Sequence, residues 1–160
     1  MRRMFVASLT TLGLAGCTGS AEHPILDQLF TASRLHDTTT LNGFSTVDID
    51  PQKQGSVLDF TIISVTPESR APLVNDSAVA QMSVADPRHP VEAAKFDGEM
   101  LSKDVTVDAT VRQPDGFSTR KTYVVTLQRA ALKGPQGEID GRWIVTNMKE
   151  ASTSVSTKTS

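Results

Sequence analysis

The stretch 103–129, KDVTVDATVRQPDGFSTRKTYVVTLQR, decides the fold of this chain. From Lys103 to Arg112, valine and alanine alternate with threonine and aspartate, and apolar residues alternate again from Thr119 to Arg129. Alternation with a period of two predicts strands that have one buried and one polar face. Between the two runs, Pro114-Asp115-Gly116 has the composition of a tight turn. The stretch therefore predicts a long antiparallel hairpin.

A third strand is predicted directly after this hairpin. Residues 133–141 are rich in glycine and form the connecting loop, and Arg142 to Met148 alternates once more, with Trp143 and Val145 on one face. The three strands form an antiparallel meander. After Glu150 the chain contains mostly serine and threonine, which bury too little surface to offset the entropy of ordering. Residues 151–160 are therefore predicted to be a disordered tail.

The mature chain is predicted to begin with a helix from Pro24 to Asp37. Proline suits the first helical position, and Arg34 and His36 suit the last turn. Five apolar side chains recur at helical spacing on one face: Ile25, Leu26, Leu29, Phe30 and Ala32. This stripe predicts a helix that packs on a sheet.

The segment between the helix and the hairpin gives weaker signals. Residues 38–43 break the helix, and Asn42-Gly43 predicts a tight turn or a bulge there. Two β-rich runs, 44–50 and 57–66, predict a hairpin closed by a loop at 51–55. The second run is apolar on both faces, which predicts a central or covered strand. Residues 67–100 predict an irregular segment with one short strand from Ala78 to Val84.

This order of elements predicts a single α+β domain over residues 24–150, with the N-terminal helix packed on a curved antiparallel sheet. The order, together with the closing pattern Gly141-Arg142-Trp143-Ile144-Val145, resembles cystatin-like and nuclear-transport-factor-2-like domains. In both of those architectures a curved sheet wraps a helix. The alternative is an immunoglobulin-like β-sandwich, which the strand content favours and the helix opposes.

The N-terminus carries a second pattern. A short basic segment, Met1 to Met4, precedes an apolar run, Phe5 to Leu14, that is shorter than the roughly 20 residues of a membrane-spanning helix. Leu14-Ala15-Gly16-Cys17 then resembles the lipobox of bacterial lipoproteins. The resemblance implies a signal peptide over residues 1–16, recognised by a signal peptidase through Leu14, Ala15 and Gly16. It also implies that Cys17 carries the lipid and that residues 17–23 form a tether.

The same resemblance implies a location in the bacterial cell envelope. Enterobacterial lipoproteins with aspartate after the cysteine stay in the inner membrane, and Thr18 stands there in this chain, so the outer membrane facing the periplasm is expected. Lysine and arginine number 16 and aspartate and glutamate 18; removal of Arg2 and Arg3 leaves 14 against 18. This acidic balance argues against nucleic acid as a partner. The only cysteine is Cys17, so no disulfide is expected.

The sequence contains no motif of a known catalytic site. His23, His36 and His89 stand alone, and the residues after Asp48 and Asp50 do not continue a calcium-binding loop. No nucleophile elbow, phosphate-binding loop or dinucleotide fingerprint is present. We therefore predict a protein that is not an enzyme and that uses neither a metal nor another cofactor.

Two hypotheses of function follow. In the first, the membrane-anchored domain binds another envelope protein through its sheet, its sheet edge or the segment Pro67 to Met100. In the second, a small ligand occupies a pocket between helix and sheet. Enzymes of the similar folds place polar groups in the concavity of the sheet, and this resemblance implies Asp59, Asp108 and Tyr123 as the pocket residues.

Overall fold

The computed structural model describes residues 21–73, 78–84, 97–134 and 137–157. These residues form a mixed structure of helices and an antiparallel sheet. The helices are α1 (His23–Arg34), α2 (Thr38–Phe44), α3 (Pro51–Gln54) and α4 (Ala78–Val84). The strands are β1 (Ser56–Val65), β2 (Ser69–Pro72), β3 (Gly98–Arg112), β4 (Ser118–Gly134), β5 (Gly137–Asp140) and β6 (Ile144–Thr157).

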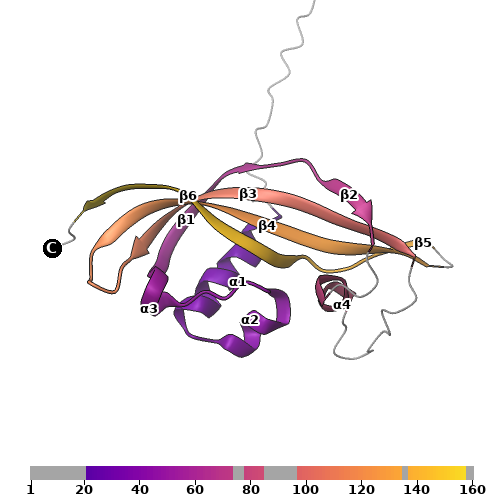
Figure 1. Ribbon diagram of the computed structural model, residues 1–160, viewed down its shortest axis with the longest axis horizontal. Coiled ribbons are helices and arrows are strands. Elements are labelled where there is room, and N and C mark those ends of the chain that lie inside the picture. Colours follow the sequence, from indigo (N-terminus) through magenta and orange to yellow (C-terminus); the bar gives the residue numbers. More distant parts are fainter. Residues whose placement is uncertain (1–20, 74–77, 85–96, 135–136, 158–160) are drawn as a thin grey trace, which may run out of the picture.

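All the described strands belong to one sheet, with β3 and β4 at its centre. Its order is β1-β3-β4-β5, while β2 also pairs with β3 and β6 also pairs with β4. Figure 1 shows the long strands arching over the helices, which gather on one face of the sheet. The core therefore lies between this helix-facing side of the sheet and the helices.

The predicted hairpin is confirmed and is longer than expected. β3 pairs with β4 from Gly98, opposite Leu132, to Arg112, opposite Ser118, with no register shift. The valines of β3 are buried on the helix-facing side, whereas its threonines and aspartates are half-buried on the other side. Gly116 adopts φ +85°, and its amide donates to the Gln113 carbonyl at 2.9 Å, which closes the turn.

The predicted N-terminal helix is also confirmed, as α1, but it ends at Arg34 and not at Asp37, and His36, expected in its last turn, lies beyond it at φ +55°. Pro24 lies in its first turn, and the apolar stripe faces the sheet, with Leu26 and Leu29 fully buried. Leu35, which does not fit the stripe, is 68% exposed. Burial of these side chains stabilises the fold by roughly 25 cal/mol for each Å² of apolar surface that is removed from water. This apolar face positions α1 on the sheet.

The predicted turn at residues 38–43 is wrong, because these residues form α2. The Asp37 carboxylate caps the helix by accepting hydrogen bonds from the Thr40 amide at 3.0 Å and the Thr40 hydroxyl at 2.6 Å. Leu41 and Phe44 are buried in the core, so tertiary packing holds a segment that contains Asn-Gly in helical form. The cap and these two side chains outweigh the low helix propensity of the segment.

The predicted strand at 44–50 is wrong as well, and so is its hairpin with the next strand. Only Ser45 makes a β-bridge, to Val145, and the chain then turns into α3, which is capped by the Asp50 carboxylate through the Gln52 amide at 2.9 Å. Gly55 then leads into β1 at φ +86°. β1 pairs with β3 instead, so the partner of β1 lies far away in sequence.

β1 lies at the edge of the sheet, not at its centre, but α1 covers its inward face, where His23 and Phe30 contact Phe60. Its pairing with β3 shifts register twice, between Val57 and Asp59 and between Ile62 and Ser64. Each shift leaves one extra apolar residue, Leu58 and Ile63, outside the ladder. Four other apolar residues keep positions opposite the buried valines and alanine of β3: Val57, Phe60, Ile62 and Val65. The sequence therefore suggested two apolar faces where β1 has one inward face and two bulged residues.

The predicted strand from Ala78 to Val84 is wrong: these residues form α4. Alanine, glutamine and methionine are good helix formers, and Ala80 and Ser83 are buried. The Ser83 hydroxyl accepts a hydrogen bond from the Ala130 amide at 2.9 Å and donates to the Arg142 carbonyl at 2.8 Å. Residues 85–96 of the segment predicted to be irregular lie outside the described residues.

The C-terminal part departs from the predicted tail. β6 begins at Ile144 and continues to Thr157, and its last pair places Thr157 opposite Ser118. The tail prediction is therefore wrong for residues 151–157, because β4 extends far enough to offer backbone partners to a run rich in serine, threonine and valine. The predicted loop at 133–141 contains the short strand β5, which also pairs with β4.

Candidate functional site

The first candidate surface is the edge formed by β1. Within the described part of the chain β1 pairs with β3 alone, so its other edge has no strand partner there. Three of its apolar side chains are exposed: Leu58 by 38%, Ile63 by 56% and Val65 by 38%. An exposed apolar edge strand can pair with an extended segment of another chain. The two bulges create this property, because they direct Leu58 and Ile63 away from the core.

The second candidate surface surrounds the point where the chain enters α1. The Glu22 carboxylate and the Lys103 ammonium form an ion pair at 2.5 Å, and their side chains are only 11% and 8% exposed. Glu68 lies 3.8 Å from the same ammonium. Lys103 belongs to β3 on the helix-facing side, opposite Leu127. The ion pair therefore fixes the start of the domain to the centre of the sheet.

Trp143, just before β6, is held among these charges. The Lys103 ammonium lies 4.1 Å from the indole centroid, and the Arg129 guanidinium carbon lies 4.9 Å from it, so both make cation–π contacts. Arg129 also pairs with Asp140 at 2.7 Å, while its Nε is buried without a hydrogen-bond partner among the described residues. These contacts hold the half-buried indole in place.

A hollow of about 590 Å³ opens beside Trp143. Its wall is formed by the start of α1, including Pro24 and Ile25, by Phe44 and other residues of α2, and by Arg142 with Trp143. The Arg142 side chain is exposed, and its Nε donates to the Met82 carbonyl at 2.9 Å. The hollow thus combines an apolar wall, an indole and a guanidinium.

A second hollow, of about 370 Å³, lies between the α1–α2 turn and the segment before α3. His36, Asp48 and Asp50 line it, and His36 adopts φ +55°, which non-glycine residues rarely do. Hydrogen bonding from the Gln52 amide, and then from Lys53, lowers the pKa of the Asp50 carboxyl. Asp50 acts as a helix cap here, and Asp48 does not share a strand face with it.

The three predicted pocket residues do not come together. By strand register, Asp59 and Asp108 lie on the face of the sheet that points away from the helices. Asp59 is exposed, and Asp108 accepts a hydrogen bond from the Thr122 hydroxyl at 2.6 Å. Tyr123 lies on the opposite face, 6% exposed, opposite Val107. Its pKa is raised to about 12 by burial and by the nearby Glu150 carboxylate.

The space between helices and sheet is filled with side chains. Core residues from α1, α2 and the central strands, including Leu29, Phe44 and Val125, pack there as one cluster. Neither of the two hollows is lined by any of the predicted pocket residues. Two features of the sequence could have pointed to the larger hollow. They are Trp143, the only tryptophan of the chain, and the apolar start of the first helix.

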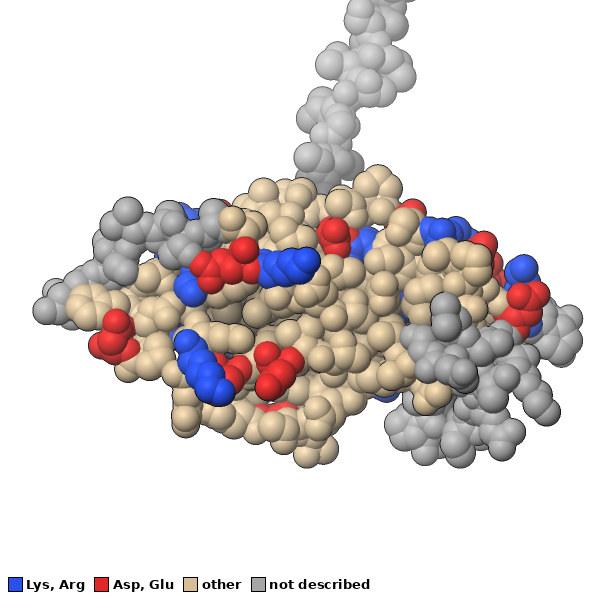
Figure 2. All heavy atoms as spheres, viewed as in Figure 1, with Lys and Arg blue, Asp and Glu red and all other residues tan. Residues whose placement is uncertain are grey.

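Other sequence predictions bear on residues and surfaces elsewhere. The lipobox residues Leu14, Ala15, Gly16 and Cys17 lie outside the described residues. Among the residues that are described, no group of three or more histidine, cysteine or acidic side chains could hold a metal ion. None of the described helices has the length and hydropathy that a bilayer-spanning helix requires. Figure 2 shows acidic and basic side chains intermixed on the visible face.

Comparison with protein-family models, with curated proteins and with solved structures finds no match to this chain. Its function is therefore inferred from the residues and surfaces described above.

Proposed function

We propose that this chain is a bacterial envelope lipoprotein, anchored to the membrane through lipid on Cys17, and that its domain binds another envelope protein. The lipobox Leu14-Ala15-Gly16-Cys17 supports the anchor. The first described helix, α1, begins at His23, which leaves a short tether between Cys17 and the fold. Two or three acyl chains make release from a membrane negligible. Thr18 after the cysteine supports the outer membrane, facing the periplasm, as the location.

We assign the domain to the α+β class, with an N-terminal helix on a curved antiparallel sheet as in cystatin-like and nuclear-transport-factor-2-like domains. Two observations support this assignment: α1 packs on the sheet through its apolar stripe, and the helices gather on one face beneath the arched strands (Figure 1). The membership of all described strands in one sheet favours it over a β-sandwich.

The observation that carries the binding function is the exposed apolar edge of β1. An extended segment of the partner would add to this edge by backbone hydrogen bonds, and the exposed Leu58 and Ile63 would give it side-chain contacts. Binding is favoured over a small-ligand pocket between helix and sheet, because that interior is filled and Asp59, Asp108 and Tyr123 lie on different faces. The same separation supports a non-catalytic role.

The anchor is tested by Cys17→Ala. Without the thiol no thioether to diacylglycerol forms, and processing of a lipoprotein precursor depends on that step, so the variant should accumulate as an uncleaved precursor. The measurement is the mass of the N-terminal peptide together with membrane fractionation. A variant that is still cleaved and released in soluble form at wild-type levels would show that the lipobox interpretation is wrong.

The binding edge is tested by site-specific photo-crosslinking in intact cells. A photo-reactive amino acid replaces Ile63 on the β1 edge or, as the control, Leu35, which is exposed at the end of α1 on the helix side. We expect one envelope protein to crosslink through position 63 and not through position 35.

The matched charge variants give the second readout. Ile63→Lys places a charge on the edge strand and should abolish the crosslink introduced at position 58, whereas Leu35→Lys should leave it unchanged. Equal crosslinking from positions 63 and 35, or insensitivity to Ile63→Lys, would contradict the edge as the binding surface.

A further inference from the structure

We infer that the hollow beside Trp143 rests on the phospholipid headgroups of the membrane that holds the chain, with the indole at headgroup level. The inference extends the proposed function, because it relies on the lipid at Cys17. It concerns a different surface from the β1 edge. It also specifies how the domain is oriented on the membrane.

The length of chain before the domain limits where the membrane can be. Glu22 is only the fifth residue after Cys17. At roughly 3.5 Å per residue, Glu22 lies within about 18 Å of the lipid-bearing residue. Residues near Glu22 are thus the part of the described domain that comes closest to the bilayer surface.

The ion pair between Glu22 and Lys103 decides which surface of the domain faces the membrane. Both side chains are almost fully buried and their charged groups are 2.5 Å apart. Separation of such a pair would leave a buried charge without its partner, which is strongly unfavourable. The start of the domain therefore cannot swing away from the sheet, and the surface around Glu22 is the one presented to the lipid.

The chemistry of that surface suits phospholipid headgroups. The hollow of about 590 Å³ begins at Ala21 and combines Pro24 and Ile25 with Trp143 and Arg142. Tryptophan prefers the membrane–water interface, where its ring is in an apolar region and its N–H is near water. An exposed guanidinium forms strong hydrogen bonds with phosphate oxygens. Cation–π contacts already hold the indole in place, so little side-chain entropy is lost on contact.

Trp143 is also the only tryptophan in the chain, so its fluorescence reports on this surface alone. The test uses the mature lipidated protein reconstituted into vesicles of phosphatidylethanolamine and phosphatidylglycerol. Some vesicles contain a lipid with a quenching spin label at the headgroup, and others a lipid labelled deep in the acyl chain. We expect a loss of Trp143 emission with the headgroup label and a much smaller loss with the deep label.

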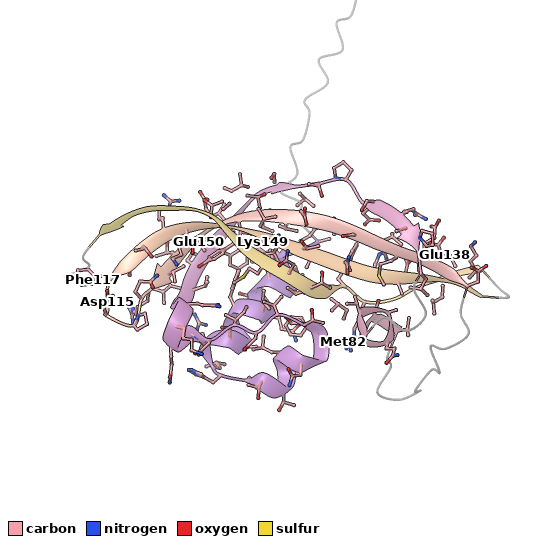
Figure 3. The ribbon with its side chains drawn as sticks, viewed as in Figure 1. Met82, Asp115, Phe117, Glu138, Lys149 and Glu150 are labelled. Carbon is pink, nitrogen blue, oxygen red and sulfur yellow. The ribbon has the colours of Figure 1, made fainter. Side chains whose placement is uncertain are left out.

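The matched control moves the tryptophan to a distant place. The double variant Trp143→Phe with Phe117→Trp keeps one tryptophan but places it at the turn between β3 and β4. Figure 3 labels Phe117 at the end of the sheet opposite Glu138. Phe117 directly precedes β4 and is eleven residues from Gln128, which pairs with Ile144 next to Trp143, so the two sites are roughly 36 Å apart. This tryptophan should not be quenched by either label.

Flotation of the vesicles and the mass of the N-terminal peptide separate the different failures. Lipidated protein that floats with the vesicles but shows no quenching of Trp143 would overturn the inference and leave the anchor intact. The inference would also be overturned if Trp143 were shielded from iodide in water but untouched by the lipid labels, because a protein segment would then cover the hollow. Unmodified Cys17 would overturn the proposed anchor and this inference together.

Discussion

β3 takes part in two long ladders that differ in regularity. With β4 it pairs through all 15 of its residues without a register shift, whereas with β1 the register shifts twice. From Val105 to Val111 of β3 and from Tyr123 to Leu127 of β4 every second residue is a buried apolar one, so only one register buries the apolar set. In β1 two extra apolar residues interrupt the alternation. The buried face decides the register in both ladders, and β1 keeps its buried face by expelling Leu58 and Ile63.

The difference shows that an apolar residue in this sheet is not by itself a core residue. Val57 and Leu58 are neighbours of similar hydropathy, yet Val57 packs against the core and Leu58 is 38% exposed. An edge strand tolerates a bulge because only one side of it must match a partner. A central strand such as β4 has partners on both sides. Substitutions in the two ladders should therefore differ in their effect on stability.

The largest effect is expected at the centre of the hairpin. Leu127→Ala removes a side chain of β4 that is fully buried on the helix-facing side of the sheet, and should lower the free energy of unfolding by about 2–5 kcal/mol. The matched variant Leu58→Ala alters a half-exposed bulge residue and should change the free energy of unfolding by about 0.5 kcal/mol. Urea denaturation of the two purified variants measures both. Equal losses would show that the bulge residue is part of the core.

A smaller loss is expected where the chain enters β1. Gly55→Ala should destabilise the protein by about 1–3 kcal/mol, because φ is +86° and a Cβ would lie 2.7 Å from the Arg112 carbonyl oxygen. Gly43→Ala is the control, since a Cβ there meets nothing within 4 Å and α2 would gain helix propensity. In thermal unfolding, the midpoint temperature of Gly55→Ala should be lower than that of the wild type, and the midpoint of Gly43→Ala should be equal to it or higher.

The next effect depends on pH and involves the only tyrosine, Tyr123, which β4 buries opposite β3. Its pKa is raised to about 12 in the folded chain, compared with 10.0 for an exposed tyrosine. Between these values the unfolded chain loses the proton and the folded chain keeps it, so stability falls as pH rises from about 10 to 12. Tyr123→Phe should remove this part of the fall. Absorbance of tyrosinate gives the folded pKa, and a value near 10 would contradict the burial.

The smallest effect is expected at the second bulge. Ile63→Thr changes a side chain that is 56% exposed and lies outside the ladder, so the free energy of unfolding should change by no more than about 0.5 kcal/mol. Urea denaturation measures it. A loss of stability above about 1.5 kcal/mol is typical of substitutions at a buried isoleucine, and would mean that β1 depends on Ile63 for its register.

The parts of the fold that the sequence predicts correctly are those in which one physical signal dominates. Strict alternation predicted β3 and β4, and helical spacing predicted α1, because each pattern buries an apolar face in only one conformation. The errors fall where local propensity competes with tertiary packing. Asn42-Gly43 favours a turn, yet the burial of Leu41 and Phe44 makes the segment helical. Alternation at 44–50 suggests a strand, but no strand partner is available except at Ser45.

The candidate site was harder to predict for a physical reason. Glu22, Lys103 and Trp143 come together from three distant parts of the chain, and no local pattern marks such a contact. A lysine in the buried phase of a strand was the available signal, since Lys103 occupies the same face as the valines that follow it. Asp59, Asp108 and Tyr123 were expected in a pocket as polar residues within strands. Strand register, which the sequence leaves open, puts Tyr123 on the other face.

Ser83 has a consequence for the order in which the protein folds. β4 pairs with β6 up to Gln128 and with β5 from Ala131. In the gap between these two ladders, the Ser83 hydroxyl accepts a hydrogen bond from the Ala130 amide. The β3–β4 hairpin closes a short turn, so it can form early and quickly. Ser83 contacts residues 47 and 59 positions away, and the second contact requires the chain reversal before β6. Contacts of such long range cost more loop entropy and form late. α4 should therefore dock after the β3–β4 hairpin has formed, and the protection of the Ala130 amide from hydrogen exchange during refolding would date that step.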